Sequence, residues 1–141
     1  MKTVYEKISI DSTMRFQIIE ITRKVEHIVK RAKIKKGIVN IATMHTTSGI
    51  RVNESEPHLL KDVELFFKEM VPAGKGYGHD IAPVDNRKNT DAHLRSWMLG
   101  ASETLPVQEG VIVKGTWQRI FFVELDGPRK QRNVNITIVG E

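Results

Sequence analysis

The chain of 141 residues contains no cysteine. A disulfide framework, a thiolate nucleophile and a thiolate metal site are therefore excluded, which leaves histidine, aspartate and glutamate as the available metal ligands. Aromatic residues make up only 6% of the sequence, and no apolar run is long enough to span a membrane. The polar, basic start at Met1 also lacks the apolar segment of a secretory signal peptide. We therefore expect a cytoplasmic protein with no membrane partner.

The composition is that of a small globular protein. Hydrophobic residues account for 40% of the chain and charged residues for 28%, which are ordinary values for a folded domain. The chain is also long enough to bury a core without covalent cross-links. We expect a single domain over residues 1–141.

The formal net charge of +5 raises the question of an anionic partner. Much of the excess lies in residues 23–36, on the solvent side and end of an expected helix, and in residues 129–132. Neither group alternates with aromatic side chains, as platforms for single-stranded nucleic acid do, and no zinc-finger or RNP motif is present. The sequence therefore does not favour nucleic acid as a partner. A phosphorylated small-molecule substrate remains the alternative.

Hydrophobic periodicity predicts three helices and at least six strands. Two initial strands are expected to form a hairpin across the polar turn Asp11-Ser12-Thr13, and the last helix is expected to face inward through Leu94, Trp97 and Met98. The second helix shows a regular apolar stripe from Leu59 to Met70. This order favours an α+β fold, with about three helices in one layer against a largely antiparallel or mixed sheet. The expected strands cover residues 4–10, 15–19, 38–44, 103–107, 111–125 and 133–139, and the expected helices cover 21–36, 55–70 and 90–99.

Four of the five histidines are crowded between His45 and His93. Histidine has the unperturbed pKa closest to neutral pH and is the commonest neutral metal ligand, so such crowding indicates acid–base or ligand chemistry. Each histidine taken singly also fits a surface or hydrogen-bonded structural position. His58, in the first turn of the second helix, fits a structural role as well as a functional one, and His27 lies off its apolar stripe and is expected at the surface.

His93 is expected in the first turn of the third helix. Unpaired N–H groups and the helix dipole there favour anions and a neutral imidazole. Ser96 follows one turn later, near the same face, where its hydroxyl can join a phosphate contact, and Arg129 is expected nearby. The alternative is a histidine that simply begins a helix in water.

The histidines also suggest a metal site. His45, His79 and His93 with Glu54 offer a nitrogen and oxygen ligand set for zinc or another divalent ion, although no tight zinc spacing such as His-Glu-x-x-His is present. Asp80 follows His79 directly, but adjacent residues need not face each other, so no relay follows from this pair. The sequence also lacks a Walker loop, a Gly-x-Gly-x-x-Gly motif and a Gly-x-Ser-x-Gly motif.

Two features of residues 114–123 predict a buried strand. In an extended conformation, Thr116 and Gln118 point one way and line a pocket, while Trp117 anchors the sheet from the other side. The tract from Ile120 to Val123 is apolar on both faces, as in a strand that lies between helices and another layer or subunit. Core packing alone is the alternative reading of this segment.

These motifs, in this order and spacing, resemble the YjbQ-like family, also called the secondary thiamine-phosphate synthase family. The resemblance covers nearly the whole chain and is carried by His45-Thr46-Thr47-Ser48-Gly49, Asn53-Glu54, Gly78-His79-Asp80, Ala92-His93-Leu94, Gly115-Thr116-Trp117-Gln118 and Gly127-Pro128-Arg129. It implies a small α+β domain that forms a homotrimer, with sites near subunit interfaces. It also implies a thiamine-phosphate synthase-like reaction, in which hydroxymethylpyrimidine diphosphate and a thiazole phosphate are joined and pyrophosphate is released.

The resemblance also implies roles for individual residues. Those implied to be catalytic are His45, Glu54, His79, Asp80 and His93, of which the histidines are also candidate ligands for zinc or magnesium. Those implied to bind substrate are Asn53, Ser96, Thr116, Gln118 and Arg129. His58 is left out, because family members often carry an acidic residue there, and Ser48-Gly49 departs mildly from the small residue, such as alanine, that is usual in the family.

One mismatch accompanies the resemblance. The usual thiamine-phosphate synthase is a barrel that works with magnesium, and 141 residues are too few for that barrel. The synthase reaction is therefore expected as a secondary activity. Two alternatives stay open: a metal-assisted hydrolase with the three histidines as ligands and Glu54 as base, and a non-catalytic trimeric module that binds a phosphorylated metabolite.

Overall fold

The structure, a computed structural model, describes residues 1–141 and contains eight strands and four helices. The strands are β1 (Lys2–Ile10), β2 (Gln17–Glu20), β3 (Lys36–Thr43), β4 (Ser48–Glu54), β5 (Ser102–Gln108), β6 (Val111–Ile112), β7 (Gln118–Glu124) and β8 (Arg132–Gly140). The helices are α1 (Thr22–Ala32), α2 (Pro57–Met70), α3 (Gly78–Ile81) and α4 (Thr90–Leu99).

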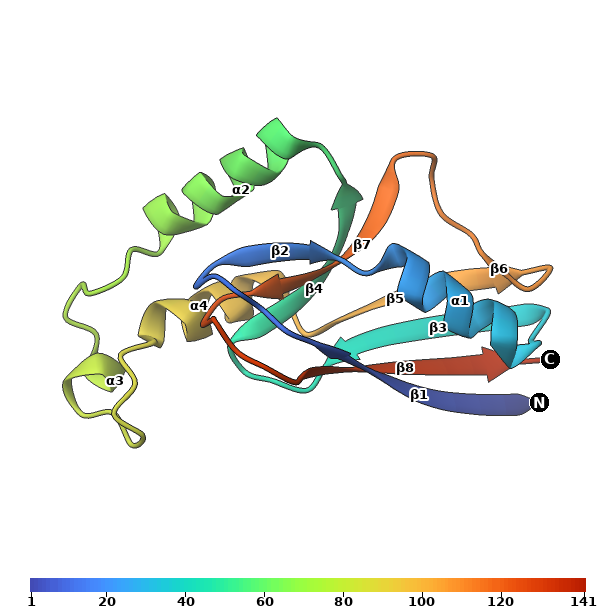
Figure 1. The fold of residues 1–141 in the computed structure, drawn as a ribbon, viewed down its shortest axis with the longest axis horizontal. Coiled ribbons are helices and arrows are strands. Elements are labelled where there is room, and N and C mark those ends of the chain that lie inside the picture. The colour runs from blue at the N-terminus through green and yellow to red at the C-terminus, as the bar shows by residue number, and fades with distance from the viewer.

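The strands form two antiparallel sheets. The larger sheet has the order β1-β8-β3-β5-β6, and the smaller has the order β2-β7-β4. Lys2 lies opposite Gly140, so the two ends of the chain lie side by side at one edge of the larger sheet (Figure 1). The predicted α+β class, with three substantial helices against antiparallel sheets, is confirmed.

The predicted hairpin between the first two strands is wrong. β1 pairs with β8 and β2 pairs with β7, so the two strands belong to different sheets. The segment between them does not turn the chain back, because it is held inside the protein: the N–H group of Ser12 donates to the carbonyl of Arg129, and its hydroxyl donates to Glu124. The polar residues that suggested a turn instead serve a buried network.

The main core lies between α1 and the larger sheet. The α1 residues Val25, Ile28 and Val29 are buried there, as the periodicity predicts, and His27 is exposed, as expected. In β7, Ile120 and Phe122 join this core. Phe121 and Val123 point to the other side and join a second cluster with residues of α2 and α4.

Both faces of β7 are therefore buried within one chain. The apolar tract from Ile120 to Val123 has the predicted burial, but both of its packing layers come from this chain. The tract is consequently no argument for a second subunit.

The predicted inward faces of the other two long helices need correction. In α2 only Phe67 is buried, while Phe66 and Met70 stay exposed, and a groove of about 380 Å³ lies between this helix and β4 and β7. Figure 1 shows α2 standing away from the smaller sheet. The apolar stripe is thus only partly covered in the single chain.

In α4 the buried face is polar, which the hydrophobic pattern cannot indicate. Asp91 and Arg95 are buried, lie 3.1 Å apart as an ion pair, and Arg95 also donates twice to the carbonyl of Val71. Leu94, Trp97 and Met98 are exposed as a result, against expectation. None of the helices is both long enough and apolar enough to cross a membrane.

Candidate functional site

A cleft of about 640 Å³ lies between α4 and the loop that joins β3 to β4. It brings together His45 and His93, which are far apart in the sequence, along with Ser96 one turn further along α4. The residues lining the cleft are Thr43, Met44, His45, Thr46, His93, Ser96, Trp97, Gly100 and Ala101.

The cleft depends on the close approach of α4 to β4. The Ser96 hydroxyl donates to the Ser48 carbonyl at 2.7 Å, and a methyl group on Gly49 would lie only 2.8 Å from Cβ of Leu99. Gly49 therefore allows the helix and the strand to touch. Because the Ser96 proton is used in this bond, its oxygen can only accept a hydrogen bond, which suits positioning of the helix better than contact with a phosphate.

The protonation of His45 is set by the backbone. The N–H group of Asn133 donates to Nε2 of His45 at 2.8 Å, so this nitrogen must carry the lone pair and the proton lies on Nδ1. Burial is the largest cause that lowers the pKa of His45, followed by the positive charge of Arg132, while Glu124 opposes the shift and Arg129 adds to it. His45 is therefore a neutral hydrogen-bond donor with two arginine side chains and one glutamate side chain acting on it.

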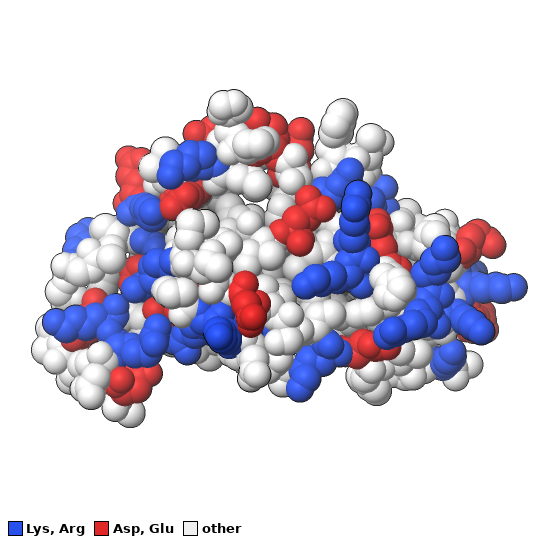
Figure 2. All heavy atoms as spheres, in the orientation of Figure 1, with Lys and Arg blue, Asp and Glu red and all other residues white.

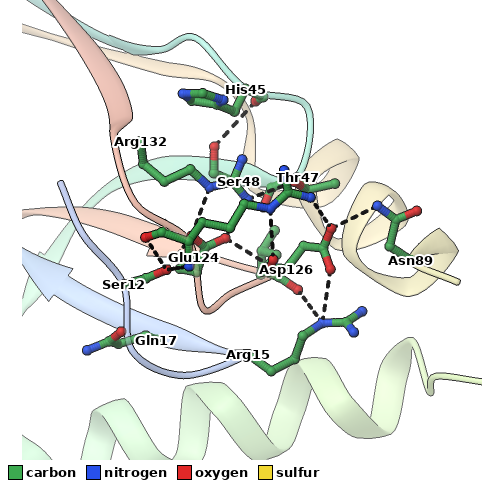
Figure 3. A network of polar contacts seen from close by, with 12 residues as sticks. Ser12, Arg15, Gln17, His45, Thr47, Ser48, Asn89, Glu124, Asp126 and Arg132 are labelled. Carbon is green, nitrogen blue, oxygen red and sulfur yellow. Dashed lines mark hydrogen bonds and ion pairs between the residues drawn. The ribbon is translucent and has the colours of Figure 1, made fainter. Parts of the chain in front are cut away.

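A buried ion pair beneath the cleft fixes this region. Arg132 donates to both carboxylate oxygens of Glu124, at 2.8 and 2.5 Å, and to the Thr47 hydroxyl at 2.8 Å (Figure 3). Burial alone would raise the pKa of Glu124, but hydrogen bonds from Arg132, the Asp126 amide and Ser12 outweigh it and lower the pKa. The ion pair fixes the positions of Thr47 and of the start of β8. Both segments adjoin His45, so its position is fixed as well.

Asp126 is the centre of a second set of ion pairs. Its side chain is contacted by the guanidinium groups of Arg15, Arg87 and Arg129, and it also accepts from Nδ2 of Asn89 at 2.8 Å. Figure 3 shows this carboxylate between Arg15 and Asn89. Burial would raise the pKa of Asp126, but the hydrogen bonds from Arg87, Asn89 and Arg129 lower it, so the carboxylate is ionised at neutral pH. Arg129 thus has a structural partner, while its guanidinium keeps donors that this partner does not use.

Asn89 links Asp126 to His79 through two hydrogen bonds. Since Nδ2 of Asn89 faces an ionised carboxylate, its Oδ1 must face His79, where it lies 3.0 Å from Nε2. Neutral His79 therefore carries its proton on Nε2 and a lone pair on Nδ1. Its ring packs edge to face on His93, with the ring centroids 5.1 Å apart. His45 and His79 are thus held in opposite tautomers, one with a free donor and the other with a free acceptor.

Asp80 lies outside α4 and binds the first residue of this helix, Thr90. Its buried carboxylate accepts from the Thr90 N–H group at 3.1 Å and from the Thr90 hydroxyl at 2.7 Å. These two hydrogen bonds are the main causes that lower its pKa. Asn89, which directly precedes the helix, makes no side-chain capping bond. The Asp80 side chain is therefore engaged with α4 in a positioning role.

The remaining residues that the resemblance assigns to a site lie elsewhere in the chain. Asn53 and Glu54 line the groove beside α2, at the end of β4 away from the cleft. Glu54 lies opposite Gln118, and Ser48 lies opposite Glu124. Since β4 has 7 residues, its two ends are separated by roughly 20 Å.

The segment before β7 is a turn instead of the expected strand. Gln118 accepts from the Gly115 N–H group at 2.7 Å, so its side chain closes this turn. Trp117 does not anchor the sheet, because its side chain is 71% exposed. Thr116 is also exposed in the turn. Within one chain, Thr116 and Gln118 accompany Glu54 and lie away from the histidines.

The expected three-histidine metal site does not form within one chain. No group of three or more histidine, aspartate or glutamate side chains lies close enough to hold a metal ion. Nε2 of His45 and Nε2 of His79 are both engaged in hydrogen bonds. The three histidines of a single chain are therefore not arranged as a metal site on their own.

Comparison with known proteins places these features in a family. The family model described as "UPF0047 protein YjbQ-like" matches residues 6–141. The chain belongs to the YjbQ-like family. A UPF0047 protein of Methanothermobacter thermautotrophicus is 39% identical over 141 residues, which is 100% of this chain and 95% of that protein.

Solved structures of similar proteins share the whole fold. A protein of unknown function from Sulfolobus solfataricus, described as YbjQ-like, is 38% identical with a TM-score of 0.94, and the match covers 99% of each chain. A hypothetical protein from Aeropyrum pernix is 35% identical with a TM-score of 0.88 and is matched over 100% of each chain. The YjbQ-like chain is therefore similar along its full length to these proteins.

Sequence reasoning missed two residues that organise the site. The local sequence at Asn89, just before the helix, indicates only a helix cap, and that at Asp126, just before Gly127, indicates only a turn. Their contacts join residues 37 positions apart, and no local pattern indicates such a pairing. Met44 and Trp97 were missed as cleft residues because both suggested core packing or strand structure.

Proposed function

We propose that this YjbQ-like protein is a transferase of the thiamine-phosphate synthase type, which binds a diphosphate-bearing pyrimidine in the cleft at His45. The observation that carries the proposal is that His45 and His93 share one cleft, in which Nδ1 of His45 is a donor and the field of Arg129 and Arg132 favours an anion. The resemblance to the secondary thiamine-phosphate synthases supplies the reaction class.

The reaction joins two phosphorylated heterocycles. The ring nitrogen of the thiazole phosphate forms a bond to the methylene carbon of hydroxymethylpyrimidine diphosphate, and the bond from this carbon to the diphosphate oxygen breaks. Pyrophosphate leaves with the electron pair, so negative charge develops on the leaving oxygen. Preorganised donors at this oxygen stabilise the transition state.

The chain offers such donors in fixed positions. The Nδ1–H group of His45 is held in place because Nε2 is bonded to the backbone of Asn133. The charges of Arg129 and Arg132 act on His45. Their pairs with Asp126 and Glu124 hold these guanidinium groups in place and offset part of their charge. His93, packed against His79, lines the same cleft and is the group that we propose for proton transfer.

A second group of residues joins the proposed site only when subunits assemble. Asn53, Glu54, Thr116 and Gln118 lie at the far end of the β4–β7 pair. In a cyclic homotrimer each contact joins two different surfaces of neighbouring subunits, and the proposed contact places this end of one subunit against the cleft of the next. We propose that the complete site is shared in this way.

The direct test is turnover by the purified protein. Pyrimidine diphosphate and thiazole phosphate are supplied together, and release of pyrophosphate and formation of thiamine phosphate are both measured. His93→Gln should lose most of the activity, and His27→Gln, on the exposed side of α1, should keep it. Pyrophosphate release without thiamine phosphate would indicate a hydrolase, and binding without turnover would indicate a non-catalytic module.

A further inference from the structure

Trp97 is the most unusual residue of the cleft. Its side chain is 86% exposed, although tryptophan is strongly buried in most proteins and aromatic residues make up only 6% of this chain. It lies on α4 four residues after His93, so the two side chains share one helical face, with Cβ atoms about 5–6 Å apart. Both line the cleft. A flat group that rests on the indole therefore lies within reach of His93.

The opposite wall of the cleft also suits a flat apolar ring. Met44 lies there with its side chain about half exposed, and thioether sulfur makes favourable contacts with aromatic rings. The polar imidazole of His45 lines the same cleft. The cleft thus joins an apolar, aromatic part to a part that favours an anion.

We infer that Trp97 stacks on the heteroaromatic ring of a phosphorylated ligand and sets the specificity of the cleft for flat rings. The inference rests on the proposed function of this cleft as a phosphate-binding site, and it adds the class of group that the phosphate must carry. Stacking of a base on an aromatic side chain tolerates different rings, because each ring has a π face. A pyrimidine with a phosphate attached is the simplest ligand that matches both parts.

The chain provides its own fluorescence control. Its other tryptophan, Trp117, lies in the turn before β7 and is not among the residues that line this cleft. In the Trp117→Phe variant, Trp97 is the single indole reporter. Binding of thiamine monophosphate or uridine monophosphate should quench its emission, and ribose 5-phosphate and inorganic pyrophosphate should not.

Affinity measurements on variants complete the test. Trp97→Leu should weaken binding of an aromatic phosphate about tenfold and leave pyrophosphate affinity unchanged, and Trp97→Phe should keep most of the affinity. His27→Gln, on the exposed side of α1, should change neither. Equal weakening of aromatic and non-aromatic ligands by Trp97→Leu would overturn the inference, as would the absence of any effect or of any binding by the two aromatic phosphates.

The outcomes also separate this inference from the proposed function. Binding of uridine monophosphate that depends on Trp97, with no binding of thiamine monophosphate, would support stacking and count against the synthase assignment. Turnover to thiamine phosphate that Trp97→Leu leaves unchanged would support the synthase and overturn the stacking role.

Discussion

Glu54 lies directly opposite Gln118 in the β4–β7 pair. This pairing places the two residues at the end of β4 that is away from the cleft, roughly 20 Å from Ser48. The residues that the family resemblance assigns to one site thus form two groups in a single chain. Either only one group is functional, or the two groups meet between subunits.

We predict that the protein is a trimer with shared sites. Light scattering after size exclusion should give about three chain masses. If each site takes His93 from one subunit and Glu54 from its neighbour, then Glu54→Gln and His93→Ala variants, each inactive alone, should recover about a quarter of the wild-type activity when coexpressed, because cyclic contacts between randomly mixed subunits leave that share of sites intact.

The contrary results are equally clear. A stable monomer at micromolar concentration would remove the shared site, and a trimer without complementation would confine the site to one subunit. Coexpression of His93→Ala with His45→Gln serves as the control, because these residues line the same cleft and no mixed site would regain both.

The second prediction concerns Asn89 as a positioning residue for His79. Asn89→Ala removes the acceptor 3.0 Å from Nε2 of His79, so the neutral ring is free to exchange its tautomers. Nitrogen chemical shifts should show His79 as the Nε2–H tautomer in the wild type and as a mixture in the variant. We expect kcat to fall about tenfold or more, as on loss of an oriented acid–base group, with KM nearly unchanged.

A purely structural role for Asn89 would give another pattern. Stability would fall while the His79 tautomer stayed the same, and the activity of the remaining folded protein would be normal. Asn89→Gln, which keeps the amide but lengthens the side chain, should recover part of the tautomer preference only if the hydrogen bond is what matters.

The third prediction is a dependence of stability on pH in two stages. The pKa of His45 lies below its ordinary value of 6.5, and those of Glu124 and Asp126 lie below 4.5 and 3.8. In each case the unfolded chain takes up the proton first as the pH falls, so the stabilisation is present above the ordinary pKa and is lost below it. The free energy of unfolding should decline gently below pH 6.5 and steeply below pH 4.5.

Urea unfolding across this pH range tests the assignment. His45→Gln should remove the decline between pH 6.5 and 4.5 and keep the acidic one. Glu124→Gln should instead reduce the slope at acidic pH. A His45→Gln profile that parallels the wild type would show that this imidazole is not responsible for the first stage.

How much of the structure can be predicted from the sequence depends on how far apart along the chain the interacting residues lie. Periodicity locates α1 correctly, because the buried positions of Val25, Ile28 and Val29 recur at helical spacing. It fails for α4, where the buried Arg95 has partners at Asp91 and at the carbonyl of Val71, 24 positions away. A buried ion pair leaves no hydrophobic pattern in the sequence. The pattern therefore wrongly predicts that Trp97 faces inward.

The same limit applies to the site. His45 and His93 were recognisable as chemical groups, and the cleft does bring them together. Glu54 is separated from these two histidines because of the length and register of β4. Neither property can be deduced from the sequence. The tautomers of His45 and His79 depend on Asn133 and Asn89, whose contacts only the fold creates.

The fourth prediction tests the contact between β4 and α4. Gly49→Ala should lower the free energy of unfolding by about 1–3 kcal/mol, because the new methyl group would overlap Leu99 and the Gly100 carbonyl. Gly78→Ala is the matched control, since nothing lies within 4 Å of its added carbon. Equal stability of the two variants in thermal unfolding would show that the contact is loose.

The last prediction concerns capture of the anion. Arg129 donates from Nη2 to the Asp126 carboxylate at 2.8 Å and from Nε to the Asp126 carbonyl at 3.2 Å, and its positive charge acts on His45. If its remaining N–H groups bind pyrophosphate as a planar fork, then Arg129→Lys should weaken the affinity although the charge is unchanged. Arg129→Ala should be weaker still. Arg31→Ala, which removes only an exposed pair with Glu6, should have almost no effect. Calorimetric titration with pyrophosphate compares the three variants, and each must first show a normal unfolding transition because Arg129 also supports Asp126. Equal affinities for Arg129→Ala and Arg31→Ala would mean that Arg129 serves only the buried carboxylate and that the anion is held by other groups.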